Sequence, residues 1–421
     1  MRRMVMVAGL FMASCLLAAA TAFAQGFGGQ QSGSDKMEYS EKFADVNYVG
    51  DGKTYHNLDI YLPKETKDSY PVVIHTYGSA WSMNNYKGSA DLNTICAAYL
   101  KAGYAVLTPN HRSANDAIYP AQLHDLKAVV RFVRGNAAKY KFDTSFVAMS
   151  GFSSGGHLSS LTATTCGMTE GKSGSVTVDL VGDLGEFTSF SSCIDAATLW
   201  SPPTDIYTMN PINNFMGSGT YEGAFIGAER EGNKDKWMVA SSPYYASEDD
   251  PPIIIFHGTS DQIVNIEQSE ELYDSLKNHN VVTEFVKVTG GTHGGNEMYV
   301  SENLDKAIDF LDKAREAKAA AVIPQDTLVG DTLVDDSTGL DTTAVLAGSR
   351  VQDLHVGLQG NRLVAAGADE YRFVVASVTG SLAWCGTFRG SQDLASLSSG
   401  VYAVVITAPS GAKKGLKFFK K

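Results

Sequence analysis

The sequence predicts an α/β fold, in which a mostly parallel sheet is covered by helices on both faces, followed by a linker and a small all-β domain. Short apolar runs alternate with amphipathic helical patterns up to about residue 320, which is typical of parallel strands joined by helices. Residues 324–343 are rich in Asp and Thr and contain few core-forming residues, which indicates a linker. From about residue 350 the apolar residues alternate with period two, which predicts strands.

The composition is that of an acidic folded protein with more than one domain. The chain has 421 residues, 44% of them hydrophobic, and a formal net charge of −12. This length favours two domains. The negative charge argues against a nucleic-acid partner.

The first 24 residues have the features of a secretory signal peptide. Arg2 and Arg3 precede an apolar run over residues 5–20, and Ala22-Phe23-Ala24 fits a cleavage site. We therefore expect a protein that is secreted or held at the cell surface. A lipidation box ending at Cys15 is an alternative, but the apolar run continues past this residue.

The chain divides into consecutive predicted regions. Residues 25–45 are expected to be disordered, residues 46–320 to form the α/β domain, residues 321–349 the linker and residues 350–421 the β-domain. Apolar, β-branched runs predict the strands, which lie within 46–61 (two strands), 72–76, 104–108, 146–150, 196–200, 253–257 and 284–288. Amphipathic patterns predict helices over 92–102, 121–138, 268–278 and 304–320. In the last domain the clearest strands are 371–378 and 401–407.

A G-x-S-x-G motif at residues 151–155 has Ser153 at its centre. A strand pattern precedes it and a helix-compatible run follows, which is the context of a nucleophilic serine at a sharp turn. We expect side chains at Gly151 and Gly155 to collide with neighbouring backbone. The alternative interpretation is an ordinary Ser/Gly turn.

Two later residues complete the set that a serine nucleophile needs. A serine hydroxyl requires a base, and the base requires a carboxylate that fixes its tautomer. Asp261 follows the strand at 253–257 and His293 follows the strand at 284–288. The order Ser, Asp, His and the placement after strands are those of α/β-hydrolases. We predict Ser153, Asp261 and His293 to be a catalytic triad.

An oxyanion hole needs backbone N–H groups that converge on one point. We predict one such group at Ser154 and the others at Ser79 and Ala80, in the loop that follows the strand at 72–76. The small residues of this loop allow the backbone to approach an ester carbonyl. The alternative is a plain strand-to-loop turn.

The remaining histidines and cysteines have weaker signals. His157 is expected to brace the turn, His257 to be structural and His75 to lie in the core, whereas His111 and His124 are near the site in sequence only. Cys166 and Cys193 flank a long polar insertion, and in an oxidising compartment we expect them to form a disulfide. The sequence has no zinc-ligand spacing, and we expect neither a metal nor a cofactor.

Several segments together resemble one enzyme family. Residues 77–81, Tyr-Gly-Ser-Ala-Trp, are similar to the His-Gly-Gly-Ala-Trp type motif of α/β-hydrolase esterases, with Tyr77 and Ser79 as departures. Segments 110–112, 119–128, 200–205 and 242–245 resemble the bifunctional acetylxylan esterase/feruloyl esterase family. The resemblance covers residues 55–310 and implies an α/β-hydrolase fold and a serine carboxylesterase that acts on acetyl or feruloyl esters of plant cell-wall polysaccharide. It assigns the triad and amide donors to the residues named above.

The C-terminal region has a resemblance of its own. Residues 394–402 and the end at 417–421 are similar to type A sorting domains of type IX secretion, which implies a small β-sandwich read by an export machine. A carbohydrate-binding or spacer module is the alternative. For the whole chain, two other functions stay open: a prolyl-oligopeptidase-like peptidase, although no propeller repeats occur, and a wall-binding protein without catalytic activity.

Overall fold

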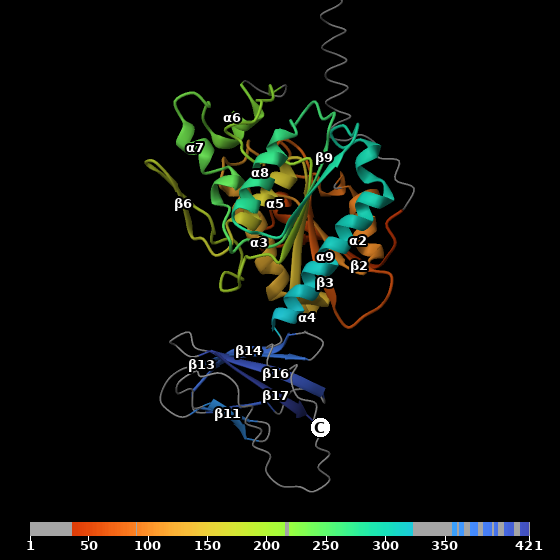
Figure 1. Cartoon of the computed structure of the whole chain (residues 1–421), viewed down its shortest axis with the longest axis vertical. Coiled ribbons are helices and arrows are strands. Elements are labelled where there is room, and N and C mark those ends of the chain that lie inside the picture. Colours follow the sequence, from red (N-terminus) through yellow and green to blue (C-terminus); the bar gives the residue numbers. More distant parts are fainter. Residues whose placement is uncertain are drawn as a thin grey trace, which may run out of the picture. The chain divides into compact units, whose positions relative to one another are not determined.

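An eight-stranded sheet organises the first part of the chain (Figure 1). The computed structural model describes residues 36–322, except 90 and 215–218, and the segments 356–359, 362–365, 371–377, 382–389, 391–394, 400–407 and 413–420. The sheet has the order β1-β2-β4-β3-β5-β8-β9-β10. These strands are β1 (Tyr39–Asn47), β2 (Asn57–Pro63), β3 (Tyr70–Thr76), β4 (Ala105–Pro109), β5 (Phe142–Phe152), β8 (Ala196–Trp200), β9 (Ile253–Gly258) and β10 (Thr283–Val288). All pairs from β4 to β10 are parallel, so the predicted, mostly parallel sheet is confirmed.

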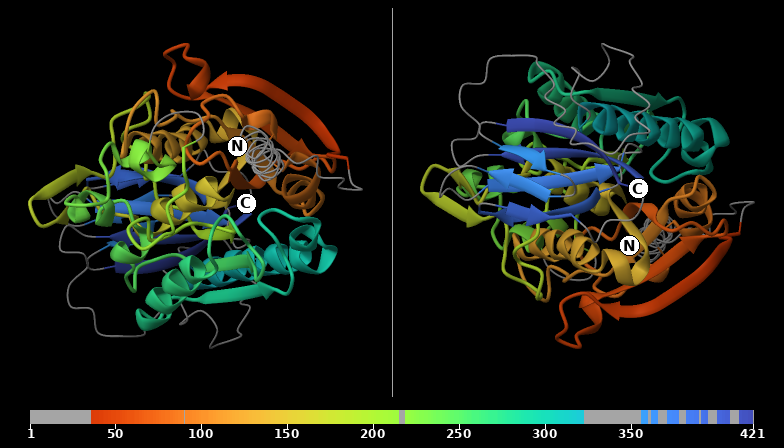
Figure 2. Two further views of the ribbon diagram at one scale, coloured as in Figure 1. Left: turned by 90° about the horizontal axis from the view of Figure 1, so that it is seen from above. Right: turned by 90° about the horizontal axis from the view of Figure 1, so that it is seen from below.

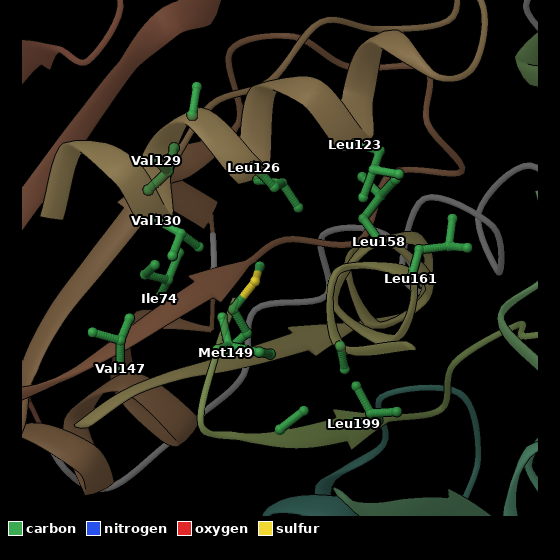
Figure 3. Packing of buried hydrophobic residues seen from close by; sticks show 14 of the residues in the cluster. Ile74, Leu123, Leu126, Val129, Val130, Val147, Met149, Leu158, Leu161 and Leu199 are labelled. Atoms are coloured by element: carbon green, nitrogen blue, oxygen red, sulfur yellow. The ribbon is translucent and has the colours of Figure 1, made fainter. Parts of the chain in front are cut away.

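Helices cover both faces of this sheet because successive strand side chains point to opposite sides. Val72 and Ile74 pack in one apolar cluster with α3, α5 and α8, and Val73 packs in a second cluster with α2 and α9. Figure 3 shows the first cluster, where Ile74 and Met149 of the sheet lie close to Leu126 of α3. The helices are α2 (Ala97–Lys101), α3 (Ala121–Gly135), α4 (Ala137–Tyr140), α5 (Ser154–Thr164), α6 (Tyr221–Ile226), α7 (Lys234–Met238), α8 (Glu267–Asn278) and α9 (Ser301–Val322). A π-helix over Leu92–Cys96 precedes α2.

The domain begins earlier than predicted. β1 starts at Tyr39, inside the segment 25–45 that we expected to be disordered, and pairs antiparallel with β2. Most of its side chains are exposed and its register shifts twice, so no hydrophobic alternation marks it as a strand.

The predicted signal peptide at 1–24 and residues 323–349 of the predicted linker lie outside the described residues. No helix in the described ranges is long and apolar enough to cross a membrane.

The long insertions contain structure that the sequence patterns did not reveal. Between Cys166 and Cys193, β6 (Glu170–Ser173) and β7 (Val176–Asp179) form a hairpin, which lies at the margin of the domain in Figure 1 and in both views of Figure 2. The two short helices α6 and α7 lie in the long segment between β8 and β9. These elements have four to six residues each, which is too short for either periodicity to be recognised.

The chain divides into two compact units, Met1–Ala314 and Arg315–Lys421. The described C-terminal segments are strands in two antiparallel sheets. One contains β11 (Val356–Gln359), β12 (Arg362–Ala365) and β15 (Ser391–Asp393), and the other contains β13 (Tyr371–Ser377), β14 (Leu382–Phe388), β16 (Gly400–Thr407) and β17 (Lys413–Lys420). The predicted sandwich and its role stay predictions.

A buried ionic network joins three segments of the α/β domain. Asp125 of α3 accepts hydrogen bonds from the Arg112 side chain, with Nη2 to Oδ1 at 2.6 Å, and from its backbone N–H. His56 Nε2 lies 3.3 Å from Asp125 Oδ1, and His56 Nδ1 lies 2.8 Å from Asp51 Oδ2. Burial alone would raise the pKa of Asp125, but hydrogen bonds from His56 and Arg112 hold it below its usual value. Burial also opposes the charge of His56, yet Asp125 and Asp51 raise its pKa.

This network predicts a pH-dependent stability. Because the pKa of His56 is raised on folding, its contribution is complete below about pH 6.5 and is lost as the pH rises through the folded-state value. Asp125 has a lowered pKa, so its contribution is present above about pH 3.9 and is lost as the pH falls further. We expect the difference in melting temperature between the native protein and His56→Gln to be largest between about pH 4 and 6.5 and to shrink toward pH 9. A difference that stays constant over this range, measured by differential scanning fluorimetry, would contradict the proposed ion pairs.

Candidate active site

Ser153 lies at a sharp turn between β5 and α5. Its φ of 54° and ψ of −126° are unfavourable for a residue with a side chain, and such backbone costs of the order of 1–3 kcal/mol. A Cβ on Gly151 would lie 2.3 Å from the carbonyl oxygen of Gly155, and a Cβ on Gly155 would lie 2.1 Å from that of Thr76. The expected collisions at both glycines are therefore confirmed, and the turn can form only without these side chains.

The loops after β9 and β10 bring Asp261 and His293 to Ser153. Because β5, β8, β9 and β10 are parallel neighbours, their carboxyl ends share one edge of the sheet. His293 Nε2 lies 3.0 Å from Ser153 Oγ, and His293 Nδ1 lies 2.8 Å from Asp261 Oδ2. The structure thus brings the three predicted residues together as hydroxyl, imidazole and carboxylate.

The surroundings of Asp261 keep its carboxylate ionised. Oδ1 accepts hydrogen bonds from the backbone N–H groups of Ile263 and Val264, each at 2.9 Å. Burial would raise the pKa of Asp261, but its electrostatic interaction with His293 and hydrogen bonds from His257 and His293 hold the pKa well below its usual range. An ionised Asp261 requires His293 to carry its proton on Nδ1, which leaves Nε2 free to accept the proton of Ser153.

The sequence reasoning missed one contact of this carboxylate. His257, which we expected to be only structural, has Nε2 3.3 Å from Asp261 Oδ2 and 2.9 Å from the carbonyl oxygen of Val264. A carbonyl oxygen only accepts, so Nε2 carries the proton, and Nδ1 accepts from Ser269 Oγ at 2.6 Å. The one sequence feature that indicates this contact is the position of His257 four residues before Asp261, at the end of the same strand.

The proposed oxyanion loop differs from the prediction at one position. The N–H of Ser79 donates to Ser154 Oγ at 2.9 Å, so this amide is occupied by a side chain that the motif alone does not reveal. The N–H groups of Ala80 and Ser154 are then the two candidate donors. Ala80 and Trp81 have φ values of 47° and 56°, so the loop turns through two consecutive left-handed residues.

Two of the other histidines, His157 and His75, are buried beneath the catalytic residues, and both lie where the sequence predicted them. His157 is buried at the start of α5, where Nδ1 accepts from Trp81 Nε1 at 3.2 Å and Nε2 donates to the carbonyl of Ala240 at 2.8 Å. Burial lowers the pKa of His157 to about 4, so it braces the turn as a neutral ring. His75 lies in the core, with Nδ1 2.9 Å from Ser150 Oγ and Nε2 3.1 Å from Asp91 Oδ2.

His111 is nearer to the site than the sequence suggested. Its ring stacks on Tyr77 of the oxyanion loop with 4.9 Å between the ring centroids, and burial lowers its pKa. His124 instead binds the insertion, with Nε2 2.8 Å from the carbonyl oxygen of Asp179. Tyr77, which stands where the family motif has histidine, is thus stacked on a histidine from another segment.

The cysteine-flanked insertion is held against α3. Cys166 and Cys193 are joined by a disulfide in the structure. Two arginines of α3 donate to carbonyl groups of this segment, Arg131 to Val181 and Arg134 to Cys193, and Lys127 donates to the carbonyl of Thr165, just before the segment. Within the described ranges, no group of three His, Cys, Asp or Glu side chains is placed to hold a metal ion.

Comparison with known proteins places the chain in a family. The BD-FAE family matches residues 58–276, just over half of the chain. The chain belongs to the BD-FAE family. The match includes Ser79, Ser153 and Asp261 but ends before His293, so the assignment of the base rests on its place in the sequence and on its distances to Ser153 and Asp261.

Solved structures and curated sequences agree with this family. A truncated form of a carbohydrate esterase from gut microbiota is 40% identical, with a TM-score of 0.63, over 66% of this chain and 98% of that one. A bifunctional GH43-CE protein of Bacteroides eggerthii is 41% identical, with a TM-score of 0.62, over 65% of this chain and 35% of that one. The probable carboxylic ester hydrolase LipM of Mycobacterium tuberculosis is 25% identical over 55% of this chain and 51% of its own length. The chain thus spans about half the length of this curated relative, and the proteins to which it is similar are esterases, which agrees with the class that the sequence predicts.

His257 generates a prediction about the BD-FAE domain. We expect His257→Leu to lower kcat by up to about 100-fold with little change in KM, because the carboxylate of Asp261 would lose a donor and its fixed orientation. His257→Gln, which keeps an N–H in a similar position, should restore part of the rate. Steady-state kinetics beside melting temperatures test this, and a leucine variant with unchanged kcat would contradict it.

Proposed function

We propose that this protein is a secreted serine carboxylesterase that removes acetyl or feruloyl groups from plant cell-wall polysaccharide. The observation that carries the proposal is the chain of hydrogen bonds from Asp261 through His293 to Ser153, at 2.8 and 3.0 Å. These atoms lie at the carboxyl ends of parallel strands, and Ser153 sits at the N-terminus of α5. Such a site supports acyl transfer to a serine.

The mechanism follows from the geometry. Ser153 Oγ attacks the ester carbonyl while His293 Nε2 accepts its proton, and Asp261 stabilises the imidazolium that forms. The amides of Ala80 and Ser154 and the positive end of α5 stabilise the charge on the carbonyl oxygen. His293 then protonates the departing sugar alcohol, and a water molecule activated by the same imidazole hydrolyses the acyl-enzyme.

The substrate class rests on the resemblances. The two solved structures that are about 40% identical are named as a carbohydrate esterase and a GH43-CE protein, which supports an acylated saccharide as substrate here. The sequence resemblance to acetylxylan and feruloyl esterases narrows this to acetyl or feruloyl groups on hemicellulose. Acetyl and feruloyl esters are therefore tested side by side.

The direct test measures release of acetate from acetylated xylan and of ferulate from methyl ferulate by the full mature chain. We expect turnover of at least one ester, and a loss of several powers of ten in Ser153→Ala. Ser301→Ala, at an exposed serine at the start of α9, is the matched control and should keep the native rate. Cleavage of peptides instead of esters would favour the peptidase alternative, and no turnover of any substrate would favour a binding protein.

We further propose that residues 1–24 direct export and that the C-terminal unit serves in type IX sorting. The support is the signal-like N-terminus, the resemblance of residues 394–421 and the division of the chain at Ala314 and Arg315. All the proposed catalytic and amide groups precede this division.

This arrangement predicts that a chain shortened to residues 36–322 folds and hydrolyses a small soluble ester at the native rate. The shortened chain keeps β1 and the whole of α9. A well-folded shortened protein, judged by circular dichroism, that had lost most of its small-ester activity would contradict the prediction. Full activity on the small ester with weaker action on insoluble xylan would identify a binding module instead of a sorting domain.

A further inference from the structure

The oxyanion loop touches the nucleophile through its backbone. A Cβ on Gly78 would lie 2.8 Å from the Cβ of Ser153, so the main chain just before Ser79 is in contact with the reacting residue. The next residue, Ala80, supplies one of the two candidate amides. Ser79 therefore lies between Gly78, whose backbone contacts Ser153, and Ala80, whose amide is a proposed oxyanion donor.

The main-chain groups of Ser79 are both engaged. Its N–H donates to Ser154 Oγ at 2.9 Å. Its carbonyl oxygen accepts from the N–H of Ser82 at 3.0 Å and from Ser82 Oγ at 2.6 Å. These bonds fix the residue from two sides, so its hydroxyl is the one polar group that is left to act.

That hydroxyl is buried without a partner. Ser79 is 3% exposed, and its Oγ has no hydrogen-bond partner within the part of the chain that the structure describes. Buried hydroxyls are normally hydrogen-bonded, because an unbonded one keeps the cost of its lost hydration. An unpaired donor in the loop that contacts the nucleophile has a use if charge develops within its reach during the reaction.

We propose that the hydroxyl of Ser79 donates a hydrogen bond to the oxyanion of the tetrahedral intermediate, in place of the Ser79 amide that Ser154 engages. This inference rests on the proposed esterase function. It assigns a catalytic role to the side chain by which this loop departs from the Gly-Gly form of the motif. It also makes Ser154 a positioning residue, since its side chain holds the loop that carries the donor.

The chemical step balances without a further reactant. Ser153 Oγ forms a bond to the carbonyl carbon, the π pair moves to the carbonyl oxygen, and the serine proton moves to His293 Nε2. The hydroxyl of Ser79 donates to the resulting oxyanion and keeps its own proton. Collapse of the intermediate expels the alcohol, which takes the proton from His293.

The test is Ser79→Ala in the full mature chain, assayed on a p-nitrophenyl ester. Loss of one oxyanion donor should lower kcat by roughly 100-fold while KM changes little. The melting temperature should stay the same or rise, because the variant removes a buried unpaired hydroxyl. The matched control is Thr108→Val in β4, which removes another buried hydroxyl without a partner in the described part of the chain and should leave the rate unchanged.

A second readout separates catalysis from structure. A trifluoromethyl ketone forms a tetrahedral adduct with a catalytic serine, and Ser79→Ala should weaken its binding by a factor similar to the loss in kcat. An active native enzyme with an equally active Ser79→Ala variant would overturn this inference alone. A loss of rate with unchanged inhibitor affinity would also overturn it. If the native protein hydrolysed no ester, the proposed function itself would fail.

Discussion

The active site depends on the close approach of three backbone segments around the turn that carries Ser153. The end of β3, the turn after β5 and the first residues of α5 approach so closely that no side chain fits at Gly151 or Gly155. This approach places the loop after β3 against the N-terminus of α5, where its amides and the helix dipole act on the same point. Removing the two glycines would therefore move the nucleophile and the oxyanion donors together.

The strain at Ser153 is supported by its surroundings. Its N–H donates to the carbonyl oxygen of Trp200 in β8 at 2.9 Å, and every residue of α5 is buried. The two apolar clusters on either side of the sheet hold these elements in place. The unfavourable backbone angles persist because packing on both faces leaves the turn no room to relax.

The polar groups at this edge of the sheet are oriented before the reaction begins. The carboxylate of Asp261 is surrounded by two backbone donors and two histidine nitrogens, so it is charged and oriented before any substrate binds. The hydroxyl of Ser79 is unpaired in the described part of the chain and is prepared for a charge that appears only during the reaction. The carboxylate has its hydrogen-bond donors in the free enzyme, whereas the hydroxyl, by our proposal, finds its acceptor only in the transition state.

Much of the α/β domain could be predicted from the sequence because its central strands β3, β4, β8 and β9 are buried on both faces. The strand at Ala196–Trp200 was predicted with its observed bounds, and β9 and β10 differ by one residue each. β1 was missed because its side chains are mostly exposed, and the β6–β7 hairpin because it is short. The region after Arg350 was predicted from alternation alone, and its role stays a prediction.

The catalytic site likewise contains residues that could be predicted from the sequence and contacts that could not. The G-x-S-x-G motif was enough for Ser153, and the order and placement after strands were enough for Asp261 and His293, because these features can be read from the sequence. The bond from the Ser79 amide to the Ser154 hydroxyl depends on a side-chain direction, and the contact of His257 with Asp261 on how a loop folds back. The sequence has no signal for the first contact, and for the second it has only the position of His257 four residues before Asp261.

The central claim is that Ser153 forms an acyl-enzyme, and peptide mapping by mass spectrometry tests it most directly. The protein is mixed with an activated acetate ester, quenched with acid within the first turnover and digested. The account predicts an acetyl group on Ser153 that disappears as deacylation proceeds. An acetyl group on Ser154 or another residue, or ester hydrolysis with no acylated peptide at any time, would contradict it.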